Sequence, residues 1–386
     1  MNHLFITGIF RSGTTFLARA LNSHPNLNVL SDPFFEFYKF LRNQYFLKID
    51  PSFDPKQPLS DYFCSRIATS ADITNFHNNL FELRIDETEV ESLKESIIKS
   101  SALFSPQLIN YINQLHSGSA IEVYEQLMII AQKSYPKPKS QFLGTKQVWT
   151  DEFVEPLIKQ GRKCIQIIRD PRAIIASNRK SSTGAYPILF LIRQWRKSVA
   201  YACHNEHNPD LLILKYEDLI QDSEISFRKI CEFLQVPFSR YLIDPKKYKD
   251  GKGEPWKQNS SHGTSTKINN SFLDKWKSIL STEEASIIEW LCGPEMHLFG
   301  YKSFNSKMPM AIENFNEESN NIADWIKAYP YFLNKIEIEK EKERLRLLGI
   351  ENPEVINEYF ISQKTYKTLK ESVTKLPNHK GSLFNQ

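Results

Sequence analysis

The first 25 residues constrain the fold of this chain most strongly. An apolar run at residues 4–6 leads into a glycine-containing turn, and residues 16–25 have helical composition closed by His24-Pro25. This order predicts a strand, a turn and a helix. Apolar runs at 163–168 and 211–214 likewise end in polar residues that precede helix-prone segments. Alternating strands and helices predict an α/β fold in which helices flank a parallel sheet on both faces.

The turn after the first strand has the spacing of a phosphate-binding loop. Gly8 and Gly13 occupy its two glycine positions, but Thr14 stands where nucleotide triphosphatases have a lysine. That lysine reaches the β- and γ-phosphates, so its absence argues against a kinase or an ATPase. The remaining loop still predicts an anion site, because backbone N–H groups at a helix N-terminus carry partial positive charge. Arg11 adds a planar cation, and Thr14 and Thr15 add hydroxyl donors.

The segment Arg11-Ser12-Gly13-Thr14-Thr15 after a first strand resembles the superfamily of sulfotransferases that use 3′-phosphoadenosine 5′-phosphosulfate (PAPS). An arginine before Ser-Gly-Thr-Thr is more similar to its carbohydrate and tyrosylprotein branches than to its cytosolic small-molecule branch. The resemblance implies a three-layer sandwich like that of the P-loop nucleotide triphosphatases. It also implies that Arg11, Ser12, Gly13, Thr14 and Thr15 bind the 5′-phosphosulfate.

The same resemblance assigns the rest of the nucleotide site. Arg169 ends the strand at 163–168, and Ser177 follows eight positions later, as in the 3′-phosphate site of the superfamily. A compact dianion suits a guanidinium and a hydroxyl. Tyr216 matches a tyrosine near the adenine or the 3′-phosphate, and Lys275 matches an anion contact from a closing loop, where Ser261 and Lys267 are also plausible. The alternatives are an Arg169–Asp170 pair and an ordinary half-buried tyrosine.

Sulfuryl transfer to a hydroxyl requires a proton acceptor and cations at the leaving phosphate. The related branches carry a glutamate after the first helix, often before proline, so Asp32-Pro33 makes Asp32 the candidate base, with Glu36 as an alternative. Arg11 and the loop N–H groups would stabilise the leaving group. Lys146 resembles a lysine near the transferring group, although a surface lysine is the other interpretation. We expect no metal.

Charge and composition limit the partners. Lys and Arg number 49 against 45 Asp and Glu, so the formal charge of +4 does not predict a nucleic-acid or membrane surface. Five scattered cysteines without a C-x-x-C pair predict neither a zinc site nor a disulfide framework. Arg11 interrupts the opening apolar run far short of the ~20 residues of a membrane span. We therefore expect a cytoplasmic protein whose acceptor bears a hydroxyl, preferably on a carbohydrate, with a tyrosyl, lipid or small-metabolite hydroxyl still open.

The change in composition along the chain predicts a sulfotransferase domain at 1–302, with a mainly helical insertion at about 35–140, and a helical C-terminal extension at 303–386. The charged segment 336–348 has the pattern of a solvated helix. The extension could be a helical cap, the arm of a possible homodimer, or a membrane-touching segment. Two rival functions remain open: a P-loop nucleotide or sugar kinase, and a non-catalytic nucleotide-binding scaffold.

Overall fold

The computed structural model describes residues 1–57, 69–179, 185–257, 273–302 and 322–374, and the single residues 268, 270, 309, 312, 315 and 317. The chain forms two compact units built from interleaved segments. The first contains Met1–Ser52, Thr74–Ile168 and Asn205–Asn270, and the second contains Phe53–Ile73, Arg169–His204 and Ser271–Gln386. The boundary expected near residue 303 stays a prediction.

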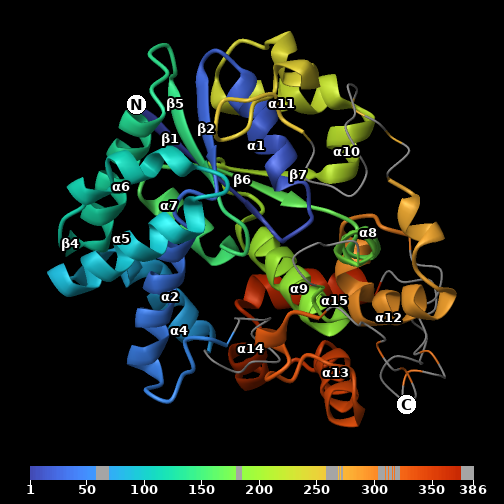
Figure 1. The fold of residues 1–386 in the computed structure, drawn as a ribbon. Helices are drawn as coiled ribbons and strands as arrows, with labels where there is room; N and C mark the ends of the chain where they lie inside the picture. Colours follow the sequence, from blue (N-terminus) through green and yellow to red (C-terminus); the bar gives the residue numbers. More distant parts are fainter. Residues whose placement is uncertain are drawn as a thin grey trace. The chain divides into compact units, whose positions relative to one another are not determined.

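A five-stranded parallel sheet forms the centre of the first unit (Figure 1). Its strands, in spatial order, are β2 (Leu27–Ser31), β5 (Phe142–Lys146), β1 (Asn2–Gly8), β6 (Lys163–Ile168) and β7 (Leu211–Lys215). In register, Lys146 pairs with Ile6 and with Ser31. The carboxyl ends of all five strands therefore lie along one edge of the sheet, which is where ligands bind in such folds. The predicted parallel sheet is confirmed.

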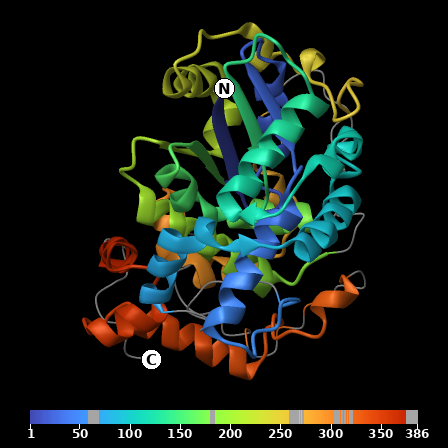
Figure 2. The same cartoon turned by 90° about the vertical axis from the view of Figure 1, so that its left-hand side faces the viewer.

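Helices cover both faces of this sheet. One core joins the sheet to α1 (Thr14–Ser23) and α11 (Ser223–Leu234), next to the short α10 (Tyr216–Gln221). The other core joins it to α2 (Phe35–Ile49), α5 (Glu87–Ser101), α6 (Ala120–Ser134) and α7 (Val154–Lys159). Leu4 and Ile6 belong to the first core and Phe5 to the second, because successive strand residues point to opposite faces. Figure 2 shows α6 running along the sheet.

The helical region after β2 contains one small antiparallel strand pair. Strand β3 (Arg84–Ile85) pairs with β4 (Gly118–Ser119), and each precedes a helix. Asp86 and Ser119 cap α5 and α6 in reciprocal capping boxes with the glutamate three residues later. Helix α4 (Ser70–Asn79) contains the boundary between the two units.

The second unit is helical in its described part. It contains α8 (Pro171–Asn178), α9 (Ile188–Asn205, whose last residue belongs to the first unit), α12 (Thr282–Leu298), α13 (Lys335–Leu347), α14 (Pro353–Tyr359) and α15 (Gln363–Thr374). None of the helices in the described part of the chain combines the length and apolar composition needed to cross a bilayer.

The prediction of a solvated helix at 336–348 is wrong for one face of α13. Glu337, Glu341 and Arg344 are buried, although the segment reads as almost wholly charged. Arginines on α9 and a glutamate on α12 supply the opposite charges, so these side chains are buried as ion pairs. Charge pattern alone did not reveal these partners, because they lie about 50 to 150 positions away in the sequence.

Candidate functional site

The loop between β1 and α1 is shaped to present backbone N–H groups. Gly13, the N-cap residue of α1, adopts a left-handed conformation with φ 94°, and no side chain in the described part of the chain caps the helix. The first turn of α1 contains no acidic residue. The buried Ser12 hydroxyl donates to Ile9 O at 2.7 Å, so this side chain closes the loop on itself. An uncapped helix N-terminus of this kind suits an anion.

Tyr216 packs directly against this loop. A Cβ built on Gly13 would lie 2.3 Å from Cδ2 of the Tyr216 ring, closer than any real contact. Only glycine therefore allows the tyrosine, at the end of β7, to approach the N-terminus of α1. The structure thus brings together two residues that the sequence analysis placed in one nucleotide site, Gly13 and Tyr216.

Lys146 connects the loop to the candidate base. It is buried at the end of β5, where its Nζ forms an ion pair with Asp32 Oδ2 and lies 3.2 Å from Thr15 Oγ1. The surface-lysine interpretation is therefore wrong. Burial lowers the pKa of Lys146 below its usual value, and the Asp32 carboxylate opposes this shift. The Lys146 ammonium thus lies between the first turn of α1 and the carboxylate.

Asp32 follows β2 directly, and only one of its two carboxylate oxygens pairs with Lys146. Its backbone N donates to Lys146 O at 2.6 Å, and its φ of 45° lies in the left-handed region. Lys146 holds Oδ2, while Oδ1 is buried and has no hydrogen-bond partner among the described residues. The alternative, Glu36, lies on the first turn of α2 and pairs with Lys39 at 3.7 Å. The free oxygen favours Asp32, whose role as base stays a prediction.

The sequence analysis missed a second buried cation, Arg19. It lies on α1, one turn after Thr15, and is 3% exposed. Burial lowers its pKa, and the carboxylates of Asp250 and Asp32 oppose that effect. A single arginine inside the apolar stretch FLARAL was the available signal. Its charge adds to that of Lys146 around the Asp32 carboxylate.

Strained backbone gathers at the same sheet edge. Four non-glycine residues have positive φ in the described part of the chain, and three of them, Arg11, Asp32 and Trp149, follow β1, β2 and β5. Trp149 N donates to Gly8 O at 3.2 Å, and its ring lies 5.7 Å from that of Phe10. Strain of this kind concentrates where side chains are held for binding or catalysis.

Arg169, Ser177 and Lys275 belong to the second unit. Trp195 of α9 donates its indole N–H to Arg169 O at 2.8 Å. Ser177 lies in the last turn of α8, whose N-terminus Asp170 caps by accepting from Arg172 N. That these residues bind the same nucleotide as the loop stays a prediction.

The closing-loop region is described only in part. Lys275 opens the 3₁₀ helix Lys275–Ser278, whose Trp276 ring lies 4.2 Å from the Arg172 guanidinium. This cation–π contact fixes the residue next to Lys275. Ser261 and Lys267 lie outside the described residues.

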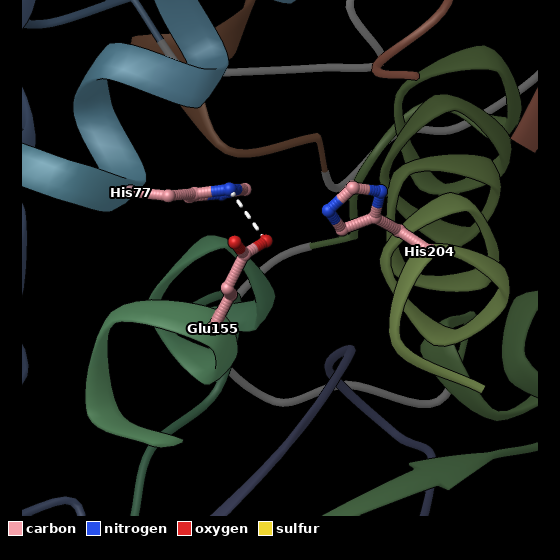
Figure 3. Close-up of side chains that lie close together, drawn as sticks. All are labelled: His77, Glu155 and His204. Carbon is pink, nitrogen blue, oxygen red and sulfur yellow. Dashed lines mark ion pairs between the residues drawn. The ribbon is translucent and has the colours of Figure 1, made fainter. Parts of the chain in front are cut away.

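A separate His–Glu pair lies elsewhere in the first unit. Nδ1 of the buried His77 on α4 is 2.8 Å from Oε2 of Glu155 on α7 (Figure 3). Lys159 pairs with the other carboxylate oxygen of Glu155. His204, also drawn, belongs to the second unit, where its Nδ1 lies 2.9 Å from Ser362 Oγ. The expectation of no metal stays a prediction.

Comparison with known proteins matches a family model to most of the chain. A family model described as "Sulfotransferase domain" matches residues 1–300. Carbohydrate sulfotransferase 3 of Mus musculus is 25% identical over 190 residues, which is 39% of this chain and 37% of that protein. The protein of the same name from Homo sapiens is 24% identical over 191 residues, 39% of this chain and 36% of that protein. The match thus spans less than two-fifths of these relatives.

Two solved structures are similar at lower identity. The sulfotransferase domain of the Synechococcus PCC 7002 olefin synthase is 19% identical and covers 73% of this chain and 89% of that one, with a TM-score of 0.42. The sulfotransferase domain from the curacin biosynthetic pathway is also 19% identical and covers 73% and 92%, with a TM-score of 0.41.

Proposed function

This chain belongs to the sulfotransferase domain family, and on that premise we propose that it transfers a sulfuryl group from PAPS to an acceptor hydroxyl, preferably on a carbohydrate. One observation carries the proposal. Lys146 contacts both Thr15, in the first turn behind the phosphate-type loop, and Asp32, the candidate base. The proposed leaving-group site and the proposed proton acceptor would therefore adjoin each other at the carboxyl edge of the sheet.

The residues of the first unit fit the phosphosulfate end of PAPS. The uncapped N-terminus of α1 offers N–H donors, and Gly13 presents no Cβ. Arg11, Thr14 and Thr15 would add charge-assisted and hydroxyl contacts, while Ser12 would hold the loop closed. In the second unit, Arg169 and Ser177 would bind the 3′-phosphate and Lys275 a further phosphate oxygen, with Tyr216 of the first unit beside the nucleotide.

When bound, PAPS supplies the sulfuryl group and an adenosine bisphosphate leaving group. The N–H groups of the loop and the Arg11 guanidinium stabilise the negative charge that grows on the leaving phosphate. Lys146 holds Asp32 Oδ2, while Oδ1 has no hydrogen-bond partner among the described residues. That oxygen takes the proton from the acceptor hydroxyl as the new bond forms.

The choice of a carbohydrate acceptor rests on the arginine-type loop and on the carbohydrate sulfotransferases that match part of this chain. A kinase would need a lysine that reaches the phosphates from the loop, and Thr14 stands there. A non-catalytic scaffold would not need a buried carboxylate with a free oxygen beside the loop. The cytoplasmic location and the possible homodimer stay predictions.

The test is a transfer assay with PAPS carrying radiolabelled sulfate. Acceptors would be a set of oligosaccharides, a tyrosine-containing peptide and a sterol, with ATP and magnesium as a parallel donor. We expect label on an oligosaccharide, no label in the Asp32→Asn variant, and no phosphate transfer from ATP. Phosphate transfer without sulfate transfer would establish the kinase alternative, and binding of PAPS without transfer to any acceptor would establish the scaffold.

A further inference from the structure

Helix α13 is tied to α9 by a fully buried ion network in the second unit. Arg193 donates to Glu337 Oε2 at 2.6 Å and to Glu341 Oε1 at 3.0 Å, and Arg196 donates to Glu341 Oε1 at 3.2 Å. All four side chains are at most 2% exposed. Charges this deeply buried tolerate no missing partner, so the network fixes the position of α9 against α13.

The other side of α9 contacts a predicted ligand-binding residue. Successive helix residues are rotated by about 100°, so Trp195 lies nearly opposite Arg193 and about 100° from Arg196 on the surface of α9. Its side chain therefore faces away from the centre of the ion network. Its indole N–H donates to Arg169 O at 2.8 Å, and the ring is fully buried. Helix α9 therefore transmits its own position to the backbone of Arg169, the residue predicted to bind a 3′-phosphate.

A parallel connection runs from α13 through α12. Arg344 forms a buried ion pair with Glu295 of α12, and Glu289 of the same helix accepts from Arg172 Nη1 at 2.7 Å. Arg172 in turn holds Asp170, the N-cap of α8, with a 2.7 Å bond from Nη2 to Oδ2. Helix α8 carries Ser177, so the two predicted 3′-phosphate residues are each supported by a helix that α13 anchors.

We propose that α13 is the positioning element of the 3′-phosphate site, with Glu341 as its central residue and Trp195 as the contact that transmits its position. The proposal rests on the function proposed above, because it assumes that Arg169 and Ser177 bind the 3′-phosphate. Glu341, Arg193 and Trp195 act through Arg169 and need not touch the nucleotide. The C-terminal extension thereby becomes part of donor recognition.

Two nucleotides that differ only in the 3′-phosphate test this. The dissociation constants of adenosine 3′,5′-bisphosphate and adenosine 5′-monophosphate would be measured by calorimetry on the full chain and on two variants, Glu341→Gln and Trp195→Phe. Glu343→Gln is the matched control, since Glu343 lies on α13 but pairs at the surface with Arg346. Thermal unfolding and circular dichroism would show that each variant is folded.

We expect both variants to bind the bisphosphate about 10- to 100-fold more weakly, the loss seen when residues that orient metal ligands are removed. Binding of the monophosphate should change less than twofold, and the control should match the wild type. Trp195→Phe keeps an aromatic ring and every charge, so it remains informative if Glu341→Gln does not fold. Equal losses for both nucleotides, or no loss in folded variants, would overturn the proposal.

The wild-type protein offers an independent measurement. Coupling between sites is reciprocal, so the bisphosphate should slow amide hydrogen exchange in α13 more than the monophosphate does. Identical protection by the two nucleotides would contradict the role of α13 even if Arg169 binds the phosphate. If the wild-type chain binds both nucleotides equally well, the 3′-phosphate site itself is wrong, and both proposals fall together.

Discussion

Replacing Gly13 by alanine tests the geometry of the loop and its contact with Tyr216. The new Cβ would lie 2.3 Å from the ring, well inside the ~3.5–4.0 Å of an ordinary carbon contact. Overlap of this size in a packed site costs about 1–3 kcal/mol. The φ of 94° adds about 1–2 kcal/mol, because left-handed backbone is unfavourable for a residue with a side chain. Together these terms predict a loss of about 2–5 kcal/mol in the free energy of unfolding.

The chain contains its own control for the backbone term. Gly253 has a φ of 87°, and a Cβ built there meets nothing within 4 Å. Gly253→Ala should therefore lose only about 1–2 kcal/mol. Urea unfolding followed by circular dichroism would measure both variants, alone and combined with Tyr216→Ala. In the Tyr216→Ala background the overlap disappears, so the cost of Gly13→Ala should fall to that of Gly253→Ala.

Two results would refute this reasoning. One is a Gly13→Ala variant that is no less stable than Gly253→Ala. The other is an excess cost that persists after the Tyr216 ring is removed, which would show that something other than this ring fills the space. A confirmed excess would establish that Tyr216 lies against the N-terminus of α1 in solution.

Three further predictions concern the candidate base, the predicted nucleotide contacts and a partly buried histidine, His3, in β1. Asp32→Asn should lower kcat by about 10²- to 10⁴-fold, the usual contribution of a general base, while calorimetry with adenosine 3′,5′-bisphosphate shows unchanged affinity; full turnover would place the base elsewhere. Arg11→Ala and Arg169→Ala should abolish binding of that nucleotide in the same calorimeter, and normal affinity in both would remove the nucleotide assignment. Burial, with help from Arg162, lowers the pKa of His3 to about 4 from 6.5. Since the unfolded chain then binds the extra proton, stability should rise with pH between 4 and 6.5, and urea unfolding of a His3→Gln variant should show a flatter rise.

Strands of the sheet could be predicted where the sequence of the strand itself is apolar enough to identify it. The run at 163–168 is mostly apolar and became β6, because a central parallel strand is buried on both faces. Strand β5 was not predicted, although it lies between β1 and β2 in the sheet. Its five residues include Gly144, Thr145 and Lys146, and all five are buried. The polar residues of β5 made it unrecognisable as a strand from its own sequence, and its position follows from its pairing with β1 and β2.

The site was predictable as a set of residues but not as a set of contacts. The sequence indicated Asp32, Lys146 and Gly13 separately, through resemblance and loop spacing. The ion pair between Asp32 and Lys146 joins positions 114 residues apart, and no local pattern encodes it. The same limit applies to Glu341, which reads as one more charge on a solvated helix until the arginines of α9 are seen beside it.

The left-handed residues Arg11, Asp32 and Trp149 have a consequence for engineering heat resistance. Replacing any one of them with glycine should raise the free energy of unfolding by about 1 kcal/mol, because glycine adopts the left-handed conformation without steric cost. A programme that repairs strained positions would select them first and would remove the Arg11 and Asp32 side chains, to which the proposed reaction assigns roles. Gln235, exposed just beyond α11 with a φ of 54°, is the position where that repair carries no such sacrifice.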